Sequence, residues 1–163
     1  MKNIEVGKNA GFCGGVELCT QKLEKLLDEY KKIYCIGEVV HNKDVVDYFK
    51  KKELIVVSSI EEMPDNVNMI IRAHGATKEL YKEAKKRNIQ VFDLTCPKVL
   101  NIRNIVKDYL NEDTYIILIA TKNHPETLST ISFCGENSSI IETEEDINKV
   151  IHKCNIYKNV LII

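Results

Sequence analysis

Short apolar runs rich in β-branched residues alternate along the chain with longer segments in which apolar residues recur at helical spacing. The short runs predict β-strands at residues 4–7, 33–36, 55–57, 69–71, 90–92, 115–120, 139–141 and 159–163. The longer segments predict α-helices at residues 16–31, 42–52, 77–87, 98–111, from 125 onward and at 143–153. Alternating strands and helices of this length are typical of an α/β protein with mostly parallel sheets.

Polar residues predict where several of these helices begin. Asn42, Thr77 and Thr143 stand directly before helical patterns and can accept a hydrogen bond from the first turn. Pro97 favours extended backbone at the preceding residue and so separates the first five strands from the rest of the pattern. We therefore expect two small lobes, residues 1–97 and 98–163, the second truncated within its last apolar strand.

Composition excludes several classes of protein. Hydrophobic residues make up 44% and charged residues 29% of 163 positions, with a net charge of −1, which is typical of a soluble globular protein. This balance argues against nucleic acid as the main partner. No apolar run approaches the roughly 18 residues that span a membrane. The N-terminus has no apolar signal segment, so we expect a cytoplasmic protein.

Candidate chemistry gathers in the segments that follow predicted strands. In parallel sheets these segments share one edge, and ligands bind there. Two cysteines, three histidines and a glutamate occupy five such loops: Cys13, His41, His74, Cys96, His124 and Glu126. We expect a functional site where these loops converge.

Each of these residues also has a plainer interpretation. A single cysteine is commonly a small buried hydrophobe, and a single loop histidine is commonly structural or solvated. The glycines around Cys13 could form a tight turn or a phosphate-binding nest. The remaining cysteines, Cys19, Cys35, Cys134 and Cys154, fall in predicted helices or strands and are expected to be packing residues. His152 is expected to be exposed near a helix end.

Five short motifs resemble the LytB/IspH family of 4-hydroxy-3-methylbut-2-enyl diphosphate reductases. They are Gly11-Phe12-Cys13-Gly14-Gly15-Val16, Glu38-Val39-Val40-His41-Asn42, Ala73-His74-Gly75, Asp93-Leu94-Thr95-Cys96-Pro97 and His124-Pro125-Glu126. The resemblance covers the whole chain and implies part of a three-lobed, trefoil-like enzyme.

The resemblance implies a metal centre and a reaction. It makes Cys13 and Cys96 ligands of a [4Fe–4S] cluster, whose third cysteine ligand is absent from this chain. The family's reaction is the reductive dehydroxylation of 4-hydroxy-3-methylbut-2-enyl diphosphate to isopentenyl and dimethylallyl diphosphate, the last step of the methylerythritol phosphate pathway. Ferredoxin or flavodoxin is the expected electron donor.

The resemblance also assigns the other candidate residues. His41, His74 and His124 would surround the substrate diphosphate. Glu126 and His124 would be catalytic, with Glu126 handling protons. The chain departs from the family pattern after His-Pro-Glu, where Thr127-Leu128-Ser129 stands in a stretch that commonly carries a glycine.

Two alternatives remain open at this point. The chain could be a non-catalytic binding or scaffold module of the same fold without a cluster, and the isolated chain is expected to be inactive. Cys13, Cys96 and a nearby histidine could instead hold zinc, which accepts such a tetrahedral set.

Overall fold

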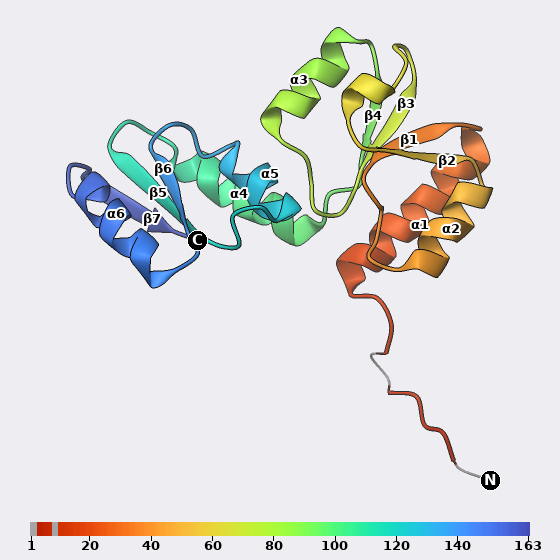
Figure 1. Cartoon of the computed structure of the whole chain (residues 1–163), viewed down its shortest axis with the longest axis horizontal. Helices are drawn as coiled ribbons and strands as arrows, with labels where there is room; N and C mark the ends of the chain where they lie inside the picture. Colours follow the sequence, from red (N-terminus) through yellow and green to blue (C-terminus); the bar gives the residue numbers. More distant parts are fainter. Residues whose placement is uncertain (1–2, 8–9) are drawn as a thin grey trace.

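The computed structural model describes residues 3–7 and 10–163, whose strands form two parallel sheets (Figure 1). The first sheet has the order β2-β1-β3-β4 and the second the order β6-β5-β7, and neighbouring strands in both orders are parallel. The strands are β1 (Ile33–Ile36), β2 (Leu54–Val57), β3 (Asn68–Ile71), β4 (Gln90–Asp93), β5 (Thr114–Ile119), β6 (Ser138–Ile141) and β7 (Asn159–Ile162). The predicted α/β class with parallel sheets is confirmed, whereas the lobe boundary at residues 97 and 98 stays a prediction.

The helices connect the strands in the predicted order. They are α1 (Gly14–Glu29), α2 (Lys43–Lys51), the short 3-10 helix η1 (Ile60–Glu62), α3 (Lys78–Lys86), α4 (Pro97–Tyr109), α5 (Pro125–Ile131) and α6 (Glu144–Cys154). The side chains of Asn42 and Thr77 accept hydrogen bonds from the backbone N–H groups of Val45 and Leu80. Thr143 and Asp146 form a reciprocal capping box at the start of α6. The predicted helix starts are therefore confirmed at these caps.

The strand predicted at residues 4–7 is wrong. These residues have no regular secondary structure, and Ile4 and Val6 are 89% and 79% exposed. A strand needs a hydrogen-bonded neighbour, and both described sheets are built without this segment. Cys13 thus stands at the start of α1, and no strand precedes it among residues 3–7 and 10–12.

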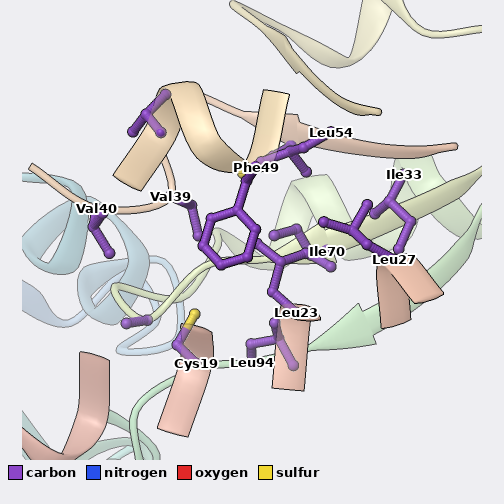
Figure 2. Close-up of a cluster of buried hydrophobic side chains, with 13 residues drawn as sticks. Cys19, Leu23, Leu27, Ile33, Val39, Val40, Phe49, Leu54, Ile70 and Leu94 are labelled. Atoms are coloured by element: carbon purple, nitrogen blue, oxygen red, sulfur yellow. The ribbon is translucent and has the colours of Figure 1, made fainter. Parts of the chain in front are cut away.

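Strand residues alternate between two faces in each sheet, and both faces are covered. On one side of the first sheet Leu23 and Leu27 of α1 and Phe49 of α2 pack with Ile70 (Figure 2). On its other side Met69 and Ile71 pack with α3 residues, including Ala84. The second sheet packs Ile116 against Val106 and Cys134, and Tyr115 and Ile117 against Val150. Burial on both faces explains why these strands have nearly continuous apolar sequences.

Replacing Leu23 with alanine is expected to lower the free energy of unfolding by about 2–5 kcal/mol, because the side chain is fully buried and leaves a cavity. Leu18→Ala, in the same helix but 38% exposed, is the matched control and should change it by less than about 0.5 kcal/mol. Urea unfolding followed by circular dichroism measures both. Equal effects of the two substitutions would contradict the placement of Leu23 in the core.

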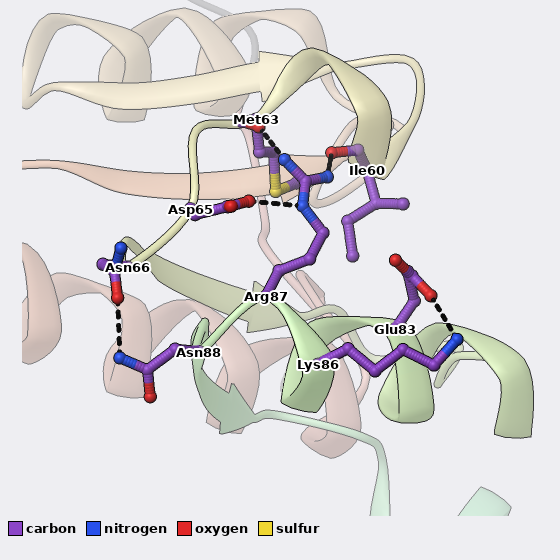
Figure 3. A network of polar contacts seen from close by, with 8 residues as sticks. All are labelled: Ile60, Met63, Asp65, Asn66, Glu83, Lys86, Arg87 and Asn88. Atoms are coloured by element: carbon purple, nitrogen blue, oxygen red, sulfur yellow. Dashed lines mark hydrogen bonds and ion pairs between the residues drawn. The ribbon is translucent and has the colours of Figure 1, made fainter.

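Arg87, directly after α3, holds the segment that leads into β3 by hydrogen bonds (Figure 3). Its guanidinium donates to the backbone carbonyls of Ile60 and Met63, and its Nε lies 2.6 Å from Asp65 Oδ1. Asn66, in the turn before β3, has a φ of +59° and accepts a hydrogen bond from Asn88. These contacts hold the amino end of β3, while the candidate residues lie beyond its carboxyl end.

The remaining cysteines are placed as packing residues. Cys19, Cys35 and Cys134 are at most 1% exposed, and burial raises the thiol pKa of Cys19 and of Cys134 to about 11. Cys154 is half-buried against the Tyr115 cluster, and His152 is exposed in the last turn of α6. No helix in the described part of the chain has the length and apolarity to cross a membrane.

Candidate functional site

The candidate histidines and Cys96 follow the carboxyl ends of parallel strands. His41 comes after β1, His74 after β3 and Cys96 after β4, so the first sheet presents all three at one edge. His124 comes after β5 of the second sheet. The two sheets therefore contribute to the same region from different parts of the chain.

The three imidazole rings lie in a row with His74 in the middle. The centre of the His74 ring is 5.5 Å from that of His41 and 5.5 Å from that of His124. His74 is half-buried, whereas His41 and His124 are exposed. The predicted convergence of these loops is confirmed for the histidines, while the roles assigned to them stay predictions.

The electrostatic surroundings of His74 favour its neutral form. Burial lowers the pKa of its imidazole below the usual value, and the positive charge of Arg72 and the neighbouring rings of His124 and His41 lower it further. Its Nδ1 atom is buried and has no hydrogen-bond partner among the described residues. Buried polar atoms are nearly always paired in folded proteins, so this atom is suited to a bound ligand.

His124 caps α5 with its ring. Its Nδ1 atom accepts a hydrogen bond from the backbone N–H of Glu126 at 3.3 Å. In the neutral ring this places the proton on Nε2, which is then the donor available to a ligand.

Glu126 lines a cavity beside His124. The cavity has a volume of about 290 Å³ and is also lined by Thr127, Thr130 and the end of β5. Glu126 and His124 thus line the same space, which is large enough for a small polar group.

Cys13 and Cys96 stand at the starts of α1 and α4, and neither side chain makes a capping hydrogen bond. A Cβ atom at Gly15 would lie 2.5 Å from Cys96 Sγ, so the Cys96 thiol packs against the turn that follows Cys13. Within residues 3–7 and 10–163, no group of three or more His, Cys, Asp or Glu side chains could hold a metal ion. Cys13 and Cys96 are both free thiols, and thiolates are the ligands that iron–sulfur clusters take, so the donor chemistry of this pair fits part of such a set.

Backbone hydrogen bonds connect the Cys96 loop to the His74 loop. The N–H of Cys96 donates to the carbonyl of Ala73 at 2.9 Å. On the other side of this loop, Asp93 Oδ1 accepts hydrogen bonds from the N–H of Thr95, at 2.9 Å, and from its hydroxyl. The position of Cys96 is therefore set by groups on both sides of it.

Two arginines at the site lie outside the five sequence motifs. Arg72 donates to the carbonyl of Glu38 at 3.0 Å and so joins the loops of His41 and His74. Arg103 of α4 donates to the carbonyl of Ala76 at 3.1 Å. Arg103 stands at helical spacing from the buried Val99 and Val106, and an arginine on an apolar helix face is the signal that could have identified it.

A family model described as "LytB protein" matches residues 4–163. The chain belongs to the LytB family. This LytB chain is 38% identical over 152 residues to 4-hydroxy-3-methylbut-2-enyl diphosphate reductase of Clostridioides difficile (strain 630), covering 91% of the chain and 53% of the relative. It is 40% identical over 147 residues to the enzyme of the same name from Francisella tularensis subsp. tularensis, covering 88% and 46%. The chain thus spans about half the length of these curated relatives.

Solved structures give the same result for the fold. The structure of E-1-hydroxy-2-methyl-but-2-enyl-4-diphosphate reductase from Plasmodium falciparum superposes with a TM-score of 0.83 at 26% identity, covering 96% of this LytB chain and 57% of that one. A second structure, named (E)-4-hydroxy-3-methyl-but-2-enyl diphosphate reductase, superposes with a TM-score of 0.80 at 27% identity, covering 100% and 67%. The resemblance noted in the five motifs is therefore confirmed.

Proposed function

We propose that this chain is the part of a LytB-family reductase that binds the substrate diphosphate and supplies two ligands of a [4Fe–4S] cluster. The whole enzyme would convert 4-hydroxy-3-methylbut-2-enyl diphosphate into isopentenyl and dimethylallyl diphosphate. The observation that carries the proposal is the row of three histidines, with the unpaired Nδ1 of His74 at its centre.

The histidine row suits a diphosphate. Such an anion carries several acceptor oxygens, and imidazole N–H groups are donors that can also take up a proton near neutral pH. His124 offers its Nε2–H because its Nδ1 is already used by the backbone of Glu126. His41 and His74 lie next to it, so one diphosphate could contact all three rings.

The cysteine pair suits a cluster that the chain holds only in part. Cys13 and Cys96 would provide two thiolates, and the family resemblance implies a third cysteine outside this chain. When bound, the cluster would pass on the two electrons of the reduction one at a time from an external donor, and it would offer a Lewis-acidic iron. Ferredoxin or flavodoxin is the proposed electron donor.

Glu126 is the proposed proton donor. The reduction consumes two electrons and two protons, and the substrate hydroxyl leaves as water. A carboxyl group beside the reacting oxygen would protonate it as the C–O bond breaks, and such general acids contribute about 10²–10⁴-fold in rate. The position of Glu126 next to His124, on the wall of one cavity, supports this role.

A scaffold role without a cluster is the second candidate for the isolated chain. It is favoured by the finding that the described residues offer no complete set of metal ligands. The isolated chain is accordingly expected to lack reductase activity, even if the whole enzyme has it.

Binding of inorganic pyrophosphate to the chain is expected to become stronger as the pH falls toward and below the usual histidine pKa of about 6.5. In the free protein the pKa of His74 is lowered, mainly by burial. A bound anion would raise this pKa, so binding would take up a proton and would be favoured at lower pH. Isothermal titration calorimetry at a series of pH values measures this dependence.

Pyrophosphate also changes its own protonation state over this pH range. A matched pair of variants separates that contribution to the pH dependence from the contribution of His74. His74→Asn should lose the part of the pH dependence that belongs to His74 and should bind more weakly. His152→Asn, which changes an exposed histidine on α6, should behave as the unchanged chain. The same pH dependence in His74→Asn and in the unchanged chain would exclude His74 from the diphosphate site.

A further inference from the structure

Arg103 lies on the inward face of α4, between the loops of the two sheets. It stands four residues after Val99 and three before Val106, both of which are buried. A charged side chain is unfavourable in such a position unless its donors are paired. Its Nε is buried without a hydrogen-bond partner among the described residues, so the contacts of its two Nη nitrogens are what explain an arginine there.

One nitrogen of Arg103 joins the His74 loop to the helix that His124 caps. Nη2 donates to the carbonyl of Ala76 at 3.1 Å and also to the hydroxyl of Ser129. The Ser129 hydroxyl in turn donates to the same Ala76 carbonyl at 3.2 Å. Ala76 is two residues beyond His74, and Ser129 lies on α5, so this junction bridges the two sheets.

The other nitrogen reaches toward the Cys96 loop. Nη1 donates to the hydroxyl of Tyr81 at 3.4 Å, and Tyr81 donates to Asp93 Oδ2 at 2.6 Å. Asp93 also receives the N–H of Thr95, the residue before Cys96. The guanidinium carbon lies 4.6 Å from the ring centre of Phe133, which adds a cation–π contact.

Gly75 leaves room for this junction. Its φ is +79°, and a Cβ atom there would overlap the Arg103 guanidinium and lie 2.7 Å from Ser129 Oγ. The residue directly after His74 therefore has to be glycine for the arginine to reach Ala76.

We propose that Arg103 is a positioning residue of the diphosphate site, which sets the separation of His74 and His124 through Ala76 and Ser129. The proposal rests on the proposed function, because it assumes that one diphosphate contacts both rings. The pair of His41 and His74 does not depend on this junction, since Arg72 joins their two loops within the first sheet. Without Arg103, His41 and His74 should therefore still respond to a bound diphosphate, whereas His124 should not.

The test is a titration of the chain with inorganic pyrophosphate, followed by NMR of the ring carbons and protons of each histidine. Arg103→Met keeps an apolar stem over Phe133 but removes the donors. It should weaken pyrophosphate affinity by about tenfold, the size of a lost charge-assisted contact. At saturation His41 and His74 should still shift, whereas the shift of His124 should be lost. Lys107→Met, at an exposed position one turn later in α4, is the matched control and should leave all three shifts unchanged.

Ser129→Gly removes the hydroxyl that links Arg103 to α5 and keeps the arginine. This variant tests the proposal even if Arg103→Met does not fold. It should reduce the His124 shift in the same selective way, by a smaller amount. The proposal is overturned if folded variants keep the full His124 shift at saturation, including the case in which only thermal stability is lowered. Absence of any histidine shift in the unchanged chain would instead overturn the proposed diphosphate site itself.

Discussion

Replacing Cys96 with serine in the protein expressed from the complete reading frame, purified without oxygen, is expected to reduce its iron and sulfide content to background. Iron–sulfur clusters are held by thiolates, and a serine hydroxyl stays protonated near neutral pH. Cys96 stands at the start of α4 with its sulfur against the turn that follows Cys13. Cys13→Ser is expected to have the same effect, because both thiols are proposed ligands of the same cluster.

The matched control for these substitutions is Cys154→Ser. Cys154 is also partly exposed, but it packs against the second sheet near the end of α6. Iron, sulfide and zinc analysis of all three variants, with visible absorption of the cluster, gives the measurement. If Cys13→Ser and Cys96→Ser both keep full cluster content, the ligand assignment is wrong. One zinc per chain without sulfide, lost in both variants, would favour the zinc alternative.

The sequence predicted most of the site because its residues are tied to parallel strands. A short apolar run such as Met69–Ile71, in a chain where such runs alternate with helical segments, favours a buried parallel strand, and the residues after it then lie at the sheet's carboxyl edge. That argument places His41 and His74 together within one sheet. It also places His124 correctly, because β5 follows the same rule in the second sheet.

The wrong prediction of a strand at residues 4–7 shows that a local pattern does not establish strand pairing. Its alternating pattern is compatible with a strand, but pairing depends on a neighbour that the local sequence does not specify. The described sheets have no place for it, and Ile4 and Val6 remain exposed. The position of Cys13 consequently comes from the start of α1 alone.

The partners of Arg103 could not be predicted from the sequence, for a different reason. The helical pattern assigns it to the inward face of α4, but it cannot say which groups face it. Its partners Ala76, Tyr81 and Ser129 come from three separate elements, and only the packing of the second sheet's helices against the first sheet's loops brings them together. Sequence spacing describes one element at a time, whereas this junction exists only between elements.

Replacing Glu126 with glutamine in the complete enzyme is expected to lower kcat by about 10²–10⁴-fold while the KM for the substrate changes little. Glutamine has the same shape and can occupy the same cavity wall, but it has no acidic proton to give to the departing hydroxyl. The backbone N–H of residue 126 still donates to His124, so the ring keeps its position and the diphosphate site is preserved.

Steady-state kinetics with a chemical reductant, together with pyrophosphate binding, measures the two effects separately. Glu136→Gln removes the same charge from an exposed position just beyond α5 and should leave kcat unchanged. A Glu126→Gln enzyme with an unchanged kcat would remove Glu126 from proton transfer. If kcat and pyrophosphate affinity fell together, the carboxyl would contribute to diphosphate binding rather than to proton transfer. General acid catalysis stabilises only the transition state and so should leave pyrophosphate affinity unchanged.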